Sequence, residues 1–466
     1  MTLTATYLSD LSRVRVAFTS APAGADYALI ERSTDGVNWT TLRGGANVPI
    51  NAGAGKIDDY EFPAGKLTTY RASYIDAADI TQVGSGTSAT ANNAAVSPSI
   101  PVGTTDGDLM TVWASIRNSG AGTVNTPAGW TKLLDFGNTA LLARKFVAGD
   151  TAPSITFAGG VANADTIAQM VTWRNADIAL TSSNTQLNAS AQNIATPALT
   201  IAAGALALCF AWKQDDWSGI NPITAFTMVA GPVSTAGDDA GQAYTFKLPA
   251  ASSYVAGADS MVVTGGAGAI SRAVIVSIAK RPYVSRETQT ITPTPLGIWF
   301  KSITRPSLNQ QVTVTDFSDL ARGSRSAFFE VVNRTMPIAN TDLMGSQRLT
   351  LVCTTPDKGE ELKLDNMLAA GDVFFIQAPS DACPIPTMYA VIDGDMARSK
   401  HSKRTARRYF DIPVREVAAP SNLITGDTVL WSDIIATYAT WQDLLNAKAT
   451  WSDVIDSVAT SVVIVP

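Results

Sequence analysis

The clearest alternation of apolar and polar positions lies in residues 348–420. The segment RLTLVCT predicts a strand, because Leu349, Leu351 and Cys353 fall on one face. A helix is expected in the following KGEELKLDNMLAAGD, where apolar residues recur at helical spacing and acidic residues occupy the first turn. Gly371 then stands where a helix C terminus accepts a left-handed residue.

Three further strands are expected after this helix. They are VFFIQ, MYAVI and YFDIPVREV, at residues 373–377, 388–392 and 409–417. In the last strand Pro413 has no amide hydrogen to donate, so we expect an edge strand or a bulged one. An edge strand is a place where another copy of the chain can attach.

Residues 1–84 have the pattern of a small β-sandwich. Strict alternation in RVRVAF and in TTYRASYID predicts strands with one apolar face. Between them, DYALIERSTDGVNWTTL predicts two strands joined at Asp35 and Gly36, a strong short-range hairpin signal.

This N-terminal pattern resembles fibronectin type III modules. The resemblance implies that Trp39, Tyr70 and Tyr74 take positions that this family fills with core aromatic residues. Such modules serve both as spacers and as adhesive units, so the resemblance does not choose between these roles.

Strand patterns recur in residues 98–280, between two expected linkers at 84–97 and 281–295. The linkers are rich in Gly, Ser, Thr, Asn or Pro and lack periodicity. The order GDLM, TPAGWTKL, LLARKFVAGD resembles jelly-roll-like β-sandwiches of phage and bacterial surface proteins. Some relatives in that group bind sugars, which makes a sugar ligand an implication of the resemblance.

Residues 421–466 contain a ten-residue repeat that begins at Trp431, Trp441 and Trp451. Ten residues advance a helix by about −80°, so the three indoles would not share a face on one helix, and separate short turns are expected. We predict that the indoles, with Leu444 and Leu445, dock into grooves of a neighbouring protein. The alternative is that this tail folds back onto its own chain.

The order of a strand, a short helix and three strands ending before Pro420 resembles the distal-tail and minor-tail proteins of long-tailed phages, those of actinobacterial phages in particular. The resemblance implies a β-barrel-like domain at residues 296–420 that joins its copies into a ring. It also implies other tail-tip proteins as partners and a location at the virion tail tip, after synthesis in the host cytoplasm.

Composition agrees with stacked β-domains and argues against nucleic acid. Charged residues make up 16% of the chain and apolar ones 46%, against roughly one quarter charged in average globular proteins. The net charge of −6 provides no concentrated basic face for a phosphate backbone. We expect no signal peptide and no membrane insertion, because the longest apolar run, 201–212, is too short for a bilayer. Among the three cysteines, Cys353 and Cys383 could pair, although free thiols are favoured in a reducing compartment.

The distribution of titratable residues argues against an enzyme. Residues 92–280 contain neither Glu nor His, so triads and zinc–His sites cannot form there, and a glycosidase would have to use Asp alone. The only histidine, His401, lies in a basic loop. Two Asp-Gly-Asp motifs, at 106–108 and 393–395, are typical of plain turns rather than calcium sites. We therefore expect no catalytic residue, metal or cofactor.

One loop is a candidate glycan site, because two indoles flank four polar side chains, the pattern by which proteins bind sugars. The loop comprises Trp212, Lys213, Gln214, Asp215, Asp216 and Trp217. The alternative is that both indoles belong to the core.

A second candidate is a basic loop with six cations among eleven residues, in a chain that is acidic overall. The cations are Arg398, Lys400, Lys403, Arg404, Arg407 and Arg408. A solvated hairpin loop is the ordinary interpretation. In a ring, Arg404, Arg407 and Arg408 could meet an acidic neighbour, and assembly would then weaken with salt.

The sequence as a whole predicts a mainly β, multidomain structural protein. It would comprise a fibronectin type III-like sandwich (1–84), a jelly-roll-like sandwich (98–280), a distal-tail-like barrel with one short helix (296–420) and an extended tail (421–466). We expect it to assemble into a three- or six-fold ring at a siphophage tail tip and to display its sandwiches for host attachment. The alternatives are a tail-associated glycan-cleaving enzyme and a bacterial surface adhesin.

Overall fold

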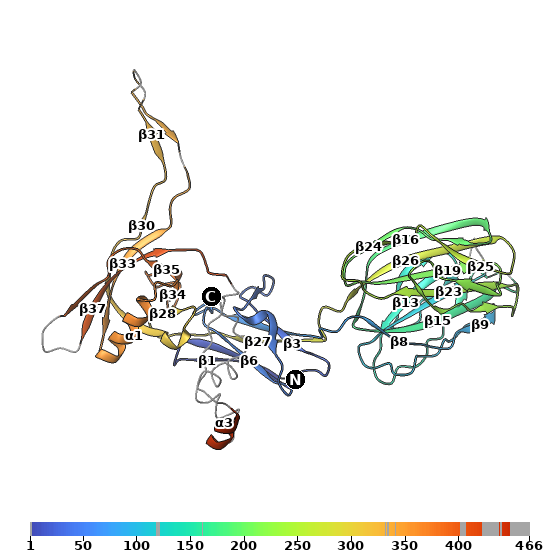
Figure 1. Ribbon diagram of the computed structural model, residues 1–466, viewed down its shortest axis with the longest axis horizontal. Helices are drawn as coiled ribbons and strands as arrows, with labels where there is room; N and C mark the ends of the chain where they lie inside the picture. Colours follow the sequence, from blue (N-terminus) through green and yellow to red (C-terminus); the bar gives the residue numbers. More distant parts are fainter. Residues whose placement is uncertain are drawn as a thin grey trace. The chain divides into compact units, whose positions relative to one another are not determined.

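The computed structural model in Figure 1 consists mainly of β-strands, with 51% strand and 6% helix, which confirms the prediction of a mainly β protein. It describes residues 2–117, 122–160, 162–330, 332, 335–340, 342–400, 407–421, 438 and 440–447. The chain forms two compact units, Met1–Ile75 with Ser285–Pro466, and Asp76–Val284. Within the described ranges, the helices are too short or too polar to cross a bilayer.

The first unit begins with a sandwich of two antiparallel sheets. One sheet has the order β1 (Thr2–Leu8), β2 (Arg13–Thr19), β6 (Gly55–Asp59). The other has the order β27 (Ser285–Ile291), β7 (Thr68–Ile75), β3 (Tyr27–Ser33), β4 (Thr40–Thr41), with β5 (Val48–Pro49) paired to β3. Alternating residues of β2 and β7, including Val14, Val16, Tyr70 and Tyr74, are buried between the sheets as their pattern predicted.

Strand β27 corrects two features of the sequence-based description. It lies in the segment expected to be a linker, yet it pairs with β7 along its whole length, from Ser285 opposite Tyr74 to Ile291 opposite Thr68. The second unit is therefore inserted between two neighbouring strands of the N-terminal sandwich. Mostly polar and exposed side chains on β27 explain why its sequence resembles a linker.

The hairpin predicted at Asp35 is present: β3 and β4 pair, with Glu31 opposite Thr41 and Arg32 opposite Thr40. The Asp35 carboxylate accepts the amides of Val37 and Asn38, both at 2.8 Å. These hydrogen bonds lower the pKa of Asp35. Trp39 is only half-buried and packs under the Arg71 guanidinium, 3.8 Å from the ring centroid, so its expected place in the core is wrong.

The second unit contains two large sheets that face each other. The first has the order β12 (Thr131–Phe136), β13 (Thr139–Lys145), β10 (Leu109–Ile116), β15 (Asp165–Arg174), β8 (Thr81–Ser85), with β9 (Ala89–Asn92) also paired to β15. The second has the order β21 (Thr227–Ala230), β23 (Ala240–Lys247), β19 (Leu206–Lys213), β26 (Ala269–Lys280), β16 (Ala176–Ala191), with β22 (Val233–Ser234) on β23. The end of β8 and the whole of β9 lie within the first expected linker.

The core between these sheets is aromatic. Trp113 of β10 stacks on Phe210 of β19, with ring centroids 4.7 Å apart. The Thr111 hydroxyl lies 2.7 Å from the Tyr244 hydroxyl and accepts the indole N–H of Trp173 at 2.9 Å. Each buried polar atom in this set has a partner, so the aromatic layer carries little desolvation cost.

The two halves of the second unit repeat one topology, a feature that the sequence-based description did not include. Strands β12, β13, β10, β15 correspond in order and direction to β21, β23, β19, β26. Behind each large sheet lies a further apolar cluster, which is covered by short paired strands. In the first half these strands are β11 (Thr123–Val124) and β14 (Phe157–Ala158). In the second half, β18 (Leu199–Ile201) pairs with β24 (Tyr254–Ala256), and β25 (Ser260–Thr264) pairs with β17 (Ile194–Ala195) and β20 (Gly219–Asn221).

The first unit continues into a closed barrel of six strands. Its order is β28 (Ile298–Ser302), β29 (Gln310–Phe317), β33 (Gln347–Thr355), β37 (Arg408–Glu416), β35 (Met388–Ile392) and β34 (Phe374–Gln377), and β34 pairs back to β28. Two short strands attach outside this ring, β30 (Ala321–Arg322) on β33 and β36 (Ala397–Lys400) on β37.

The predicted helix is α1 (Lys358–Leu368), which packs on the barrel. Asp357 accepts the Glu360 amide at 3.0 Å as its N-cap, and Gly371 adopts a φ of 70° after its end. The expected apolar face, Leu364, Met367 and Leu368, is buried.

Strand β37 is an interior strand of the closed barrel, so the expectation of an edge at Pro413 is wrong. On one side β37 pairs continuously with β33. On the other side, residues 408–411 of β37 pair with β36 and residues 414–416 pair with β35, so Pro413 lies between the two pairings. The missing donor therefore coincides with a natural interruption of the ladder, and closure leaves no edge there for another copy.

Candidate functional site

A buried polar junction joins the N-terminal sandwich to the barrel within the first unit. Lys301 of β28 is buried, and its Nζ donates to the carbonyl oxygens of Ser12 at 2.5 Å and Tyr60 at 2.7 Å. Gln377 of β34 donates through Nε2 to the carbonyl oxygen of Phe62 at 2.7 Å. Both barrel side chains thus donate to backbone carbonyl oxygens of the sandwich, and the Ser12 hydroxyl of the sandwich donates in return to Gln377 Oε1 at 3.3 Å. These hydrogen bonds tie the sandwich and the barrel into one unit.

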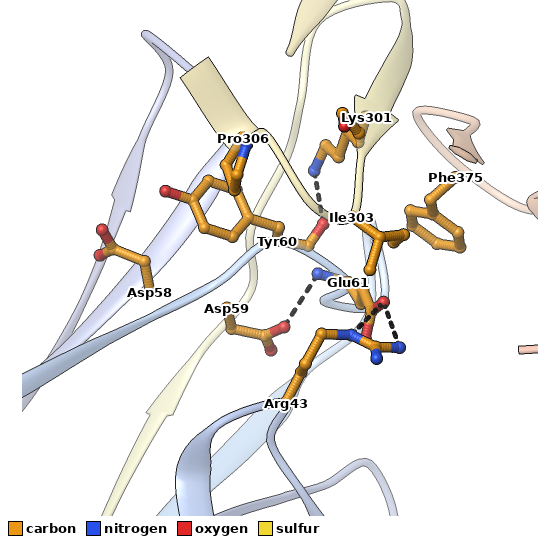
Figure 2. Close-up of a pocket in the computed structure, with 10 residues that line it drawn as sticks. Arg43, Asp58, Asp59, Tyr60, Glu61, Lys301, Ile303, Pro306 and Phe375 are labelled. Carbon is orange, nitrogen blue, oxygen red and sulfur yellow. Dashed lines mark hydrogen bonds and ion pairs between the residues drawn. The ribbon is translucent and has the colours of Figure 1, made fainter. Parts of the chain in front are cut away.

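Figure 2 shows the small cavity beside this junction, about 40 Å³ in volume. Arg43 and Glu61 form an ion pair at 2.9 Å on one side of it, and Asp59 accepts the Glu61 amide at 2.9 Å. The Lys301 ammonium points toward the Tyr60 carbonyl from the opposite side. The cavity has room for a few waters at most, so it does not suit an organic substrate.

The electrostatics of the junction follow from burial. Desolvation holds the pKa of Lys301 well below its ordinary value, although the nearby carboxylates of Asp59 and Glu61 oppose the shift. Burial, and the Asp59 carboxylate that accepts its hydroxyl at 2.8 Å, raise the pKa of Tyr70. The neutral tyrosine is thereby favoured over the tyrosinate at all ordinary pH values.

The candidate glycan loop does not present its indoles to solvent. Trp212 ends β19 and is fully buried, and Trp217 is 5% exposed. A Cβ atom on Gly241 would lie 2.5 Å from the Trp217 ring, so the ring packs flat on the backbone of β23. Sugar stacking needs an exposed aromatic face, and in this structure both indoles are instead part of the core, as the alternative interpretation held.

The polar residues of the same loop remain near the surface, except for Lys213. Lys213 is buried, with its Nζ 3.9 Å from Asp215 Oδ2, and burial lowers its pKa while Asp215 and Asp216 oppose that change. Oxygens of Asp215, Asp216 and Asp239 lie within 4.8 Å of one another and could ligate a hard cation. The lysine beside them already supplies a positive charge.

An arm extends from the barrel between β29 and β33, and Figure 1 shows it leaving the barrel wall. Its far part is a two-stranded ribbon of β31 (Ala327–Phe329) and β32 (Ile338–Asn340). Its described apolar side chains are exposed and belong to no core cluster; they are Phe328, Phe329, Val332, Met336, Ile338, Leu343 and Met344. An isolated hairpin of this kind has marginal stability in water, and its exposed apolar surface is typical of an interaction site.

A shallow hollow of about 430 Å³ lies on the barrel where the short helix η2 (Pro306–Leu308) meets the C-terminal end of α1. Leu308, Ala369 and Ala370 provide apolar surface, and Arg305, Ser307 and Asn366 provide polar groups. The hollow is large enough for one or two side chains and too open for a catalytic pocket.

The basic loop is partly neutralised by acids of its own chain. Arg408 Nε lies 3.4 Å from Glu361, and Arg398 lies 3.3 Å from the same carboxylate. Arg407 is exposed, whereas Arg404 is outside the described residues. Arg408 therefore stabilises the packing of α1 on β37, and a docking role for the loop stays a prediction.

The tail is described only around its second repeat. There Thr440 and Asp443 form a capping box: the Thr440 amide donates to Asp443 Oδ2 at 3.0 Å, and the Asp443 amide donates to Thr440 Oγ1 at 3.2 Å. In the helix α3 (Trp441–Ala447) that follows, Leu444 is buried, and Trp441 and Leu445 are exposed. Trp431 and Trp451 lie outside the described residues, so docking by the tail stays a prediction.

Sequence reasoning missed both the junction and the arm. Lys301 lies in a strand of ordinary amphipathic pattern, and nothing local indicates that its ammonium reaches another domain. The arm did offer a signal, since AFFEVV in residues 327–332 is an apolar run flanked by Arg and Ser residues. No protein-family model matches the chain, and no curated protein resembles it significantly in sequence.

Proposed function

We propose that this protein is a structural minor tail protein of a siphophage tail tip, which self-associates into a ring and carries β-sandwich modules for attachment to the host surface. The proposal includes the finer assignments made from sequence: a distal-tail-like barrel, a fibronectin type III-like sandwich and a jelly-roll-like display module.

The observation that carries this proposal is the combination of a closed barrel with an exposed apolar arm. Strands β33 and β37 close the six-stranded ring, so the barrel does not need a partner to satisfy its own edges. The arm, in contrast, exposes Phe328 and Phe329 at 66% and 56%. A barrel whose strand edges are all paired, combined with an arm whose apolar side chains are exposed, is typical of an assembly subunit.

The inserted unit suits a display role. Residues 76–284 leave the N-terminal sandwich after β7 and return at β27, and the flanking residues Tyr74 and Ser285 are directly paired. Both connections therefore lie at one end of the sandwich, where insertions are tolerated because they do not interrupt a core. The sandwich in turn is fastened to the barrel through Lys301 and Gln377, so that a ring of barrels would carry the inserted units with it.

The decisive experiment locates the chain on particles. Antibodies raised against recombinant residues 76–284 and labelled with gold should bind one end of phage tails produced by cells that encode the chain. Label on the cell envelope with bare particles would instead indicate an adhesin and overturn the proposal.

A glycan-cleaving enzyme is the other class to separate. A zymogram on cell-wall and capsular polysaccharide should show no clearing by the purified full-length chain. Clearing that is lost on substitution of Asp215 or Asp216 would contradict a purely structural role.

A further inference from the structure

The exposed apolar surface of the arm is expected to bind a partner, and the residues of the arm restrict the chemistry of that partner. On the ribbon, Phe328 pairs with Ala339 and Phe329 with Ile338, so the aromatic rings stand on a strand pair with no second layer. Phe328, Phe329 and Ile338 are all at least 48% exposed. The residue that follows, Glu330, is exposed and makes no ion pair within the described residues.

The hollow at the end of α1 has complementary chemistry. Its floor is apolar, from Leu308, Ala369 and Ala370, and its rim carries the exposed Arg305. Among described residues the Arg305 guanidinium, like the Glu330 carboxylate, has no ion-pair partner. One face of the ribbon thus offers the Phe328 ring beside the Glu330 carboxylate, because alternate residues of a strand share a face. The hollow offers an apolar floor beside the Arg305 guanidinium.

The arm does not reach this hollow within its own chain. In Figure 1 the ribbon labelled β31 extends away from the barrel, and α1 lies on the opposite side of it. The two surfaces can therefore meet only between different copies.

We propose that the arm of one copy packs Phe328 into the hollow of a second copy of this chain, where Glu330, on the same face of the ribbon as Phe328, pairs with Arg305. The contact is head-to-tail, because each copy contributes an arm to one neighbour and a hollow to the other, and such contacts generate rings when the rotation closes. This inference rests on the proposed function and names the surfaces that would join the ring.

Disulfide trapping tests the contact directly. Two populations with tags of different size are prepared, one carrying Glu330→Cys and the other Arg305→Cys, and are mixed under mild oxidation. A mixed dimer should form, at a yield at least tenfold above that of either variant mixed with wild type. The native Cys209 and Cys353 are buried and should not compete, and the partly exposed Cys383 is replaced by serine (Cys383→Ser) in both populations.

The matched control moves the acceptor to the other end of the same helix. Lys358 is exposed at the start of α1, about 15 Å from its C-terminal end at 1.5 Å per residue. Glu330→Cys mixed with Lys358→Cys should give background yield only. Equal yields for both acceptors would indicate random collision and overturn the inference.

Charge reversal provides a second measurement that does not depend on oxidation. Glu330→Arg and Arg305→Glu should each weaken self-association about tenfold in sedimentation velocity, and the double variant should restore it. Additive losses in the double variant would overturn the pairing. Gold label on tail tips together with absent trapping would refute this contact alone, whereas unlabelled tails would refute the proposed function.

Discussion

Replacement of Lys301 by Met tests how firmly the sandwich is attached to the barrel. Methionine has similar length and fills the same space, but it cannot donate to the carbonyl oxygens of Ser12 and Tyr60. Ser12 is fully buried and Tyr60 partly so, which means that one acceptor loses its partner completely and the other can recruit water. An orphaned buried acceptor costs roughly 1–3 kcal/mol, so we expect the variant to lose about 2–4 kcal/mol of unfolding free energy at pH 7.

The pH dependence of this loss provides a sharper signature. Burial lowers the pKa of Lys301 in the folded protein, while in the unfolded chain it stays near its ordinary value of about 10.4. Between these two values the unfolded state binds more protons, so the stability of the wild type rises with pH by up to about 1.4 kcal/mol per unit. The variant lacks this contribution, and its deficit relative to wild type should grow as the pH rises toward the ordinary lysine pKa.

The assay is urea unfolding followed by tryptophan fluorescence at several pH values. Lys66→Met is the matched control, since Lys66 also bridges sandwich and barrel, by an exposed ion pair with Asp381 at 2.9 Å. Exposed ion pairs contribute about 0–1 kcal/mol, so Lys66→Met should change the unfolding free energy very little. Equal losses in the two variants, or a Lys301→Met deficit that shrinks as pH rises, would refute the role assigned to the buried lysine.

Two further predictions concern the cores. Trp113→Ala should cost about 3–5 kcal/mol, because it removes the ring that stacks on Phe210 between the facing sheets; a smaller loss in calorimetric unfolding would mean that those sheets do not share one core. Burial raises the pKa of the Cys353 thiol to about 12, so a thiol reagent at pH 8 should leave it unmodified in the folded chain and modify it on addition of denaturant. Partly exposed Cys383 is the internal control and should react first, and labelling of Cys353 at the same rate would contradict the barrel packing.

Local pattern was sufficient where one face of an element is buried against its immediate neighbours. The alternation in β2, β7 and β33 identified their buried faces, and the spacing of Leu364, Met367 and Leu368 identified that of α1. Asp357, Gly371 and the Thr440–Asp443 box set helix ends through hydrogen bonds that span only a few residues. Such contacts join residues that are close in the sequence, so a short segment is enough to predict them.

Features that depend on distant segments were decided only by the tertiary structure. Strand β27 is polar, and it becomes a strand because β7 offers it an edge after an excursion of some two hundred residues. Pro413 predicted an edge, yet it lies in an interior strand of a closed barrel. The barrel tolerates the missing amide hydrogen because Pro413 faces the gap between β35 and β36, where the ladder is interrupted. Likewise Trp212 and Trp217 flank a run of polar residues as in a ligand loop, and only the packing of distant strands determines that both are core.

The sequence by itself determined the β-rich class, most individual strands, the capped helices and the absence of Glu and His from residues 92–280, since each depends on residue type and short-range spacing. The tertiary structure alone decided the insertion of one unit within another, the closure of the barrel, the burial of Lys301 and the exposure of the arm. The physical reason is that burial is a property of the space around a side chain, and that space is filled by residues far away in the sequence.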